Sequence, residues 1–100
     1  MIVYNVTIKI DATVAEEWLQ WMKVEHIPKV MATGFFLEYH IFKVLVDETD
    51  GLTYSIQYLC RTMDDYEKYV ADHAPALQAE TQKKYGKRFV AFRTLLELVS

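Results

Sequence analysis

Two of the chain's three histidines occur in near-copies of one short motif, Glu25-His26-Ile27-Pro28 and Asp72-His73-Ala74-Pro75. Imidazole titrates near physiological pH, so such a pair could provide a general acid and a general base. Each histidine also falls on an apolar stripe near the end of a helical pattern, where a structural role at the core edge is the alternative. His26 and His73 are therefore catalytic candidates.

The third histidine, His40, follows Glu38 by two residues, so both side chains leave the same face of a predicted strand. A carboxylate beside an imidazole can orient it for proton transfer, which makes His40 the third catalytic candidate; a polar pair at an interface rim is the alternative. No third metal ligand, HExxH motif or Cys/His cluster is evident, and we expect no metal site. No nucleotide loop or cofactor attachment motif is evident, and we expect no cofactor.

Three further residues are candidates for binding a ligand. Arg93 lies in an apolar stretch of the last predicted strand, where a guanidinium needs a partner: Glu97, a carboxylate of a partner chain, or an anionic ligand. Asn5 and Gln57 belong to a polar row on two predicted central strands. That row would suit a ligand pocket, or equally a water-filled part of a dimer interface. We expect Arg93, Asn5 and Gln57 to position a ligand.

The elements that must hold these residues form two βαβ halves. Alternating or continuous apolar runs predict strands at 2–10, 35–46, 53–60 and 88–99. Helical periodicity predicts one helix over 13–26, with Thr13 and Glu16 as a capping box, and another that Thr62 caps. The first helix should end or bend at Pro28, and Pro75 again interrupts the second; shorter helical stretches follow at 29–33 and 76–84. The polar segment 47–51 is the predicted hairpin connection.

The order βαββαβ, with the two histidine motifs 47 residues apart, predicts a ferredoxin-like sandwich as one domain spanning 1–100. This is an α+β fold in which two helices cover one face of a four-stranded antiparallel sheet. The second and last strands are apolar on both faces, so the other face should also be covered. We therefore predict a homodimer that packs sheet against sheet into a dimeric α+β barrel.

Composition excludes several other classes of protein. The net charge of −3, with no clustered basic surface, argues against nucleic-acid binding. The open face of the third predicted strand offers Thr53, Ser55, Gln57 and Leu59, where an RNA-recognition sheet needs aromatic residues. No apolar run approaches the length of a membrane span, and no signal peptide is evident. A single cysteine, Cys60, fits a reducing compartment. We expect a cytoplasmic protein.

The stretches MIVYNVTIKI, EEWLQWMKVEHIPKVMATG and RFVAFRTLLELV resemble an uncharacterised family of bacterial proteins of this length, known only as a domain of unknown function. At superfamily level the pattern is similar to dimeric α+β barrels, which include cofactor-free and haem-degrading monooxygenases, ring isomerases and stress-response proteins. The resemblance to haem-degrading members, which use an Asn, a Trp and a His, would give Asn5 the first role and His73 the third. The tryptophans here lie on the first predicted helix instead.

Two functions remain open at this point. One is an enzyme that binds a small apolar or aromatic metabolite in a helix–sheet or dimer cleft, with monooxygenase- or isomerase-like chemistry. The other is a non-catalytic dimeric module for ligand sensing or protein interaction. A cavity lined by a histidine together with Arg93, Asn5 or Gln57 would favour the enzyme.

Overall fold

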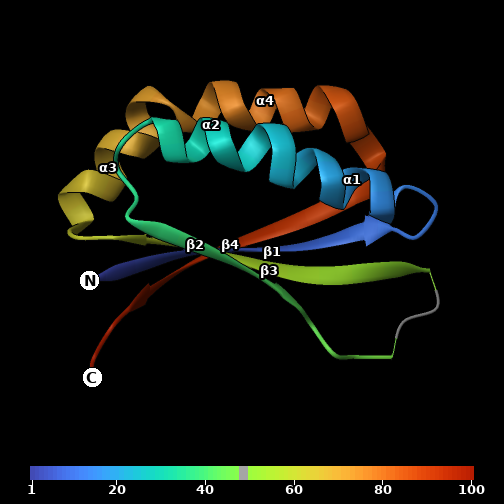
Figure 1. The fold of residues 1–100 in the computed structure, drawn as a ribbon, viewed down its shortest axis with the longest axis horizontal. Coiled ribbons are helices and arrows are strands. Elements are labelled where there is room, and N and C mark those ends of the chain that lie inside the picture. Colours follow the sequence, from blue (N-terminus) through green and yellow to red (C-terminus); the bar gives the residue numbers. More distant parts are fainter. Residues whose placement is uncertain (48–49) are drawn as a thin grey trace.

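The computed structural model describes residues 1–47 and 50–100. Four antiparallel strands form one sheet in the order β2-β3-β1-β4, and all helices lie on one of its faces (Figure 1). The elements, in chain order, are β1 (Ile2–Asp11), α1 (Ala15–Trp21), the π-helical turn η1 (Met22–His26), α2 (Ile27–Ala32), β2 (Glu38–Lys43), β3 (Gly51–Cys60), α3 (Met63–Asp72), α4 (Ala74–Tyr85), the 3-10 turn η2 (Gly86–Arg88) and β4 (Phe89–Glu97). The predicted βαββαβ order and ferredoxin-like sandwich are confirmed.

The alternation of β1 sets the two faces of the sheet. Its even-numbered residues from Tyr4 to Ile10 are buried beneath the helices, while the odd-numbered residues are only half-buried. Each residue of β1 pairs with one on β3 and one on β4, so side chains opposite one another share a face. We call the face without helices the open face; no described element covers it (Figure 1).

The first helical segment continues past Pro28, so of the two predicted alternatives the helix does not end there. It runs from Ala15 to Ala32 through the π-helical turn η1, in which the Ile27 N–H bonds to the Met22 carbonyl. Proline has no N–H, and its ring clashes with the carbonyl four residues earlier. Widening the preceding turn avoids that clash, so Pro28 fits at the start of α2.

The predicted capping box of the first helix is also wrong. Val14 is the N-cap residue and makes no side-chain cap bond. Thr13 instead donates from its backbone N–H and its hydroxyl to the carboxylate of Asp11, at 2.8 and 2.7 Å. Thr62 does cap α3 as predicted, because its hydroxyl accepts from the Asp65 N–H at 3.1 Å. Pro75 again sits in the first turn of a new helix, α4.

Two strands are shorter than predicted. The strand expected at 35–46 covers only Glu38–Lys43, and the one expected at 88–99 covers Phe89–Glu97. β2 and β4 are the sheet edges, where pairing on one side alone lets the strand ends leave the ladder. Asp47 to Gly51 was the predicted hairpin connection; Glu48 and Thr49 lie outside the described residues.

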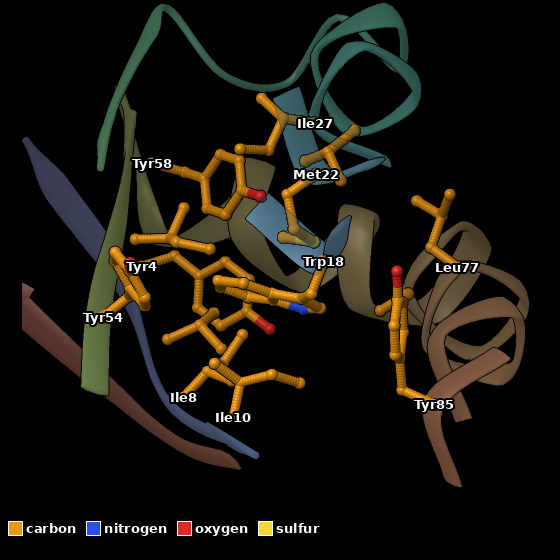
Figure 2. Close-up of a cluster of buried hydrophobic side chains, with 14 of the residues drawn as sticks. Tyr4, Ile8, Ile10, Trp18, Met22, Ile27, Tyr54, Tyr58, Leu77 and Tyr85 are labelled. Carbon is orange, nitrogen blue, oxygen red and sulfur yellow. The ribbon is translucent and has the colours of Figure 1, made fainter. Parts of the chain in front are cut away.

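The core lies between the helices and the sheet, where Trp18, Met22 and Ile27 form one cluster with Tyr54 and Tyr58 (Figure 2). On the far side of this cluster, Leu77 and Tyr85 project toward it from α4 (Figure 2). Cys60 is buried, and burial raises the pKa of its thiol. None of the helices in the described part of the chain is long and apolar enough to cross a membrane.

Candidate functional site

A cavity of about 480 Å³ lies between the helices and the sheet. Its floor comes from β1, β3 and β4, and its walls come from the first helical segment and α4. The volume falls within the range of small-molecule pockets, and most of the lining side chains are apolar. Two of the predicted site residues, His26 and Arg93, line it.

His26 reaches the cavity because it ends the π-helical turn. Its ring is half-buried and packs against the indole of Trp21, with 5.2 Å between ring centroids. The Nδ1 atom lies 3.4 Å from the hydroxyl of Thr81 on α4, and that hydroxyl is 3.4 Å from the Leu77 carbonyl. A hydroxyl that donates to Leu77 can accept only from a protonated Nδ1, and this tautomer leaves Nε2 as the basic nitrogen.

The environment of His26 keeps its imidazole neutral at physiological pH. Burial lowers the pKa of His26 to about 4, and the positive charges of Lys29 and Arg93 act in the same direction. The carboxylate of Glu80 opposes this shift. Glu80 is itself paired with Lys29, at 3.2 Å, in an ion pair that joins α4 to α2. At neutral pH this imidazole has a free lone pair that can accept a proton, and its lowered pKa makes it a weaker base than an exposed histidine.

Arg93 brings a cation to the same cavity. Its Nε donates a hydrogen bond of 3.1 Å to the phenolic oxygen of Tyr4. Tyr4 is 4% exposed and stacks within a cluster of rings that includes Tyr58 and Tyr69. The Arg93 side chain lines the cavity yet is exposed, so we place it at the cavity mouth.

The cavity carries one permanent charge. Among its described lining residues, Arg93 is the one permanently charged side chain, and none is a carboxylate. Burial raises the pKa values of Tyr58 and Tyr69, so their phenols stay protonated. The site therefore combines a cation, a neutral base and phenol hydroxyls inside apolar walls.

Asn5 and Gln57 lie on the open face, away from this cavity. Asn5 is the centre of a polar network: it accepts from Ser55 at 2.6 Å and donates to Thr7 and Thr94 at 3.2 Å each. Gln57 pairs with Asn5 across the strands. Arg93 pairs instead with the buried Val6, which puts it on the helix-covered face. The structure does not bring Arg93 together with Asn5 and Gln57, contrary to the prediction.

The other two histidines are also apart from the cavity. His40 lies opposite Gln57 on the open face, and its Nε2 is 3.0 Å from the Glu38 carboxylate. His73 is half-buried at the junction of α3 and α4, between the rings of Phe35 and Tyr69. Since Asn5 and His73 lie on opposite sides of the sheet, the arrangement implied by haem-degrading enzymes is not assembled. Within the described residues, no three His, Cys, Asp or Glu side chains gather as a metal site.

Several polar residues of the cavity were not predicted from the sequence, among them Tyr4 and Thr81. Tyr4 was read only as one apolar position in an alternating strand. Thr81 is a buried threonine in α4, four residues after Leu77 on the same helix face. A hydroxyl at such an inward-facing position was the available signal, because a buried hydroxyl needs a partner.

Residues 1–99 match a protein family described as Domain of unknown function (DUF4286). The chain belongs to this family. The predicted resemblance to an uncharacterised family of such proteins is thereby confirmed. A comparison with curated protein sequences finds no match for this DUF4286 chain.

Solved structures share the fold of this DUF4286 protein at low sequence identity. A dimeric ferredoxin-like protein from an uncultured marine organism is 16% identical, with a TM-score of 0.69 over 100% of this chain and 96% of the other. A candidate antibiotic biosynthesis monooxygenase from Deinococcus radiodurans is 15% identical, with a TM-score of 0.68 over 100% and 94%. SnoaB, a cofactor-independent oxygenase from Streptomyces nogalater, is 10% identical, with a TM-score of 0.69 over 99% and 94%.

Proposed function

We propose that this protein binds a small, flat, apolar molecule in the helix–sheet cavity and begins its reaction by removing a proton from it. The observation that carries the proposal is the neutral imidazole of His26 in a cavity whose one permanent charge is Arg93. A base and a cation in one apolar site favour conversion of a weak acid, such as a phenol or an enolisable ketone, into its anion.

In the proposed reaction, Nε2 of His26 takes a proton from an O–H or an acidic C–H of the substrate. The negative charge that develops on the substrate oxygen is stabilised by the phenol hydroxyls and by the positive potential of Arg93 at the cavity mouth, which acts without contact with that oxygen. Return of the proton to a different carbon gives an isomerase. Alternatively, the carbanion form of the substrate adds to dioxygen to give a hydroperoxide at that carbon; cleavage of its O–O bond with loss of water leaves one oxygen atom on the substrate as a carbonyl, which is a monooxygenase reaction. Two structural neighbours are described as monooxygenase or oxygenase.

Proton removal can be measured without knowing the natural substrate. The protein is incubated in D₂O with 2-tetralone, a flat ketone whose C–H groups beside the carbonyl are acidic, and deuterium incorporation is followed by NMR. We expect the wild type to accelerate exchange and His26→Gln to lose that acceleration. Binding of the ketone without accelerated exchange would instead support the alternative, a non-catalytic ligand-sensing module.

We also infer that a second copy of the chain covers the open face. Three large apolar side chains lie on that face: Phe42 on β2, and Phe92 and Leu96 on β4. They are 49%, 69% and 44% exposed, respectively. Large apolar side chains gathered on one surface are typical of an interface. The structural neighbour from the uncultured marine organism is described as dimeric, which supports the same arrangement.

A further inference from the structure

We infer that the ligand of the helix–sheet cavity is an aromatic monocarboxylate, whose carboxylate pairs with Arg93 and the Tyr4 hydroxyl while its ring lies among the apolar walls. This inference rests on the proposed binding function and deepens it, because it names the chemical class of the ligand.

The charge of the cavity is the first step. Arg93 forms no ion pair with any carboxylate in the described part of the chain. Glu97, the intramolecular partner considered from the sequence, lies opposite Ile2, further along β4. With no acidic lining residue described and His26 neutral, the cavity holds a single positive charge. A singly charged anion would balance it, because two opposite charges attract each other more strongly in an apolar cavity than in bulk water.

The hydrogen-bonding capacity of the pair is the second step. Arg93 uses its Nε to bond Tyr4, and its two terminal Nη groups make no hydrogen bond within the described residues. Two parallel N–H donors on a planar guanidinium match the two oxygens of a carboxylate. The Tyr4 oxygen accepts from Arg93, so its own O–H remains able to donate to a ligand oxygen.

The shape and polarity of the cavity are the third step. Apolar side chains from several elements, among them Ile8, Met22, Ile56 and Ala91, line the space beyond the arginine. An inorganic anion would satisfy Arg93 but would leave these walls facing water. A ring attached to the carboxylate fills that space and adds the free energy of apolar burial. The combination therefore favours an aromatic acid over phosphate or sulfate.

The test compares 1-naphthoate with 1-naphthamide by calorimetry, because the two molecules have nearly the same shape and differ in charge. We expect the wild type to bind naphthoate at least about tenfold more tightly, as charge-assisted hydrogen bonds predict. Arg93→Gln should reduce this preference to about onefold, and Tyr4→Phe should lower naphthoate affinity with less effect on naphthamide. Arg88→Gln is the matched control, because Arg88 lies in η2 and does not line the cavity; it should keep the wild-type preference.

Four results would contradict the inference. Equal binding of acid and amide by the wild type would overturn the carboxylate assignment while leaving the cavity as a binding site. If folded Arg93→Gln, or Arg93→Met as a second variant, still prefers naphthoate to naphthamide, a group other than Arg93 binds the carboxylate. If neither 1-naphthoate nor 1-naphthamide binds, the proposed binding function fails and this inference fails with it. Phosphate that competes as well as naphthoate would overturn the role of the apolar walls.

Discussion

Arg93 lies directly opposite Val6 in the sheet, yet its Nε donates to Tyr4, which precedes Val6 by two residues on β1, at 3.1 Å. The arginine side chain therefore extends diagonally across two strands toward the buried phenol. Diagonal neighbours on adjacent strands are within reach of long side chains. The ring of Tyr4 is fixed in turn by stacking on Phe36 and Tyr58. A flexible cation at the cavity mouth is thus held in place by the aromatic part of the core.

The pH dependence of stability should report on His26. Burial lowers the pKa of His26 to about 4 from an ordinary value of 6.5, so between these values the unfolded chain binds a proton that the folded chain excludes. Stability from this group is complete above pH 6.5 and falls as the pH drops toward 4. We expect the wild type to lose about 1–3 kcal/mol more than His26→Gln over this range, measured by urea unfolding. From pH 7 to 8 the two curves should run parallel; a parallel course down to pH 4 as well would show that His26 is not held neutral.

Thr81 should determine which nitrogen of His26 carries the proton. Thr81→Val keeps the shape of the side chain but removes the hydroxyl that lies 3.4 Å from Nδ1. The ¹⁵N shifts of the imidazole at pH 7 should then move toward the tautomer protonated on Nε2. Thr81→Ser, which retains the hydroxyl, is the control and should resemble the wild type. Unfolding free energies should change by about 1 kcal/mol or less for Thr81→Ser, and unchanged ¹⁵N shifts in Thr81→Val would refute the tautomer assignment.

Filling the cavity should block the site without unfolding the protein. Ala91 lines the cavity from β4, opposite Ile8. Because the space above it is open, Ala91→Leu should be accommodated with a change in unfolding free energy of about 1 kcal/mol or less. The same variant should weaken binding of 2-tetralone or 1-naphthoate at least about tenfold by calorimetry. Thr94→Val, on a β4 residue that lies opposite Asn5 on the open face and does not line the cavity, should bind as the wild type does. Full affinity in Ala91→Leu would place the ligand elsewhere.

A charge on the open face should separate the proposed dimer. Phe92 is 69% exposed and lies on the edge strand β4, opposite Thr7 of the Asn5 network. A glutamate buried there in both copies would face desolvation and repulsion, so Phe92→Glu should sediment as a monomer at micromolar concentration. Val24→Glu is the control, since Val24 is 59% exposed on η1, away from the open face, and should keep the dimer mass. A monomeric wild type would remove the basis of the proposal.

The fold was predictable from sequence because local patterns and connectivity agreed. The alternation of β1, the two helical stripes and the cap at Thr62 each restrict one element, and together they leave few topologies. The π-helical turn was not predicted. A proline after an apolar stripe indicates either a helix end or a widened turn, and the hydrogen bond from Ile27 to Met22 that distinguishes them depends on packing.

The site was predicted only in part, and the last strand is the reason. His26 and Arg93 were both named from the sequence, and the structure places them in one cavity. However, β4 is apolar on both faces, so alternation could not tell which face Arg93 takes. A shift of one residue in register moves every side chain to the other face. The pairing of Arg93 with Val6 resolves this, and no local signal in the sequence encodes it.

The π-helical turn rotates the second part of the helix about its axis relative to the first part. Trp18, before the turn, and Met22, its first residue, are buried in the core. His26, the last residue of the turn, lines the cavity, while Ile27, the next residue, is fully buried in the interior. Adjacent residues at the end of the wide turn therefore serve two purposes, one in the cavity wall and one in the core.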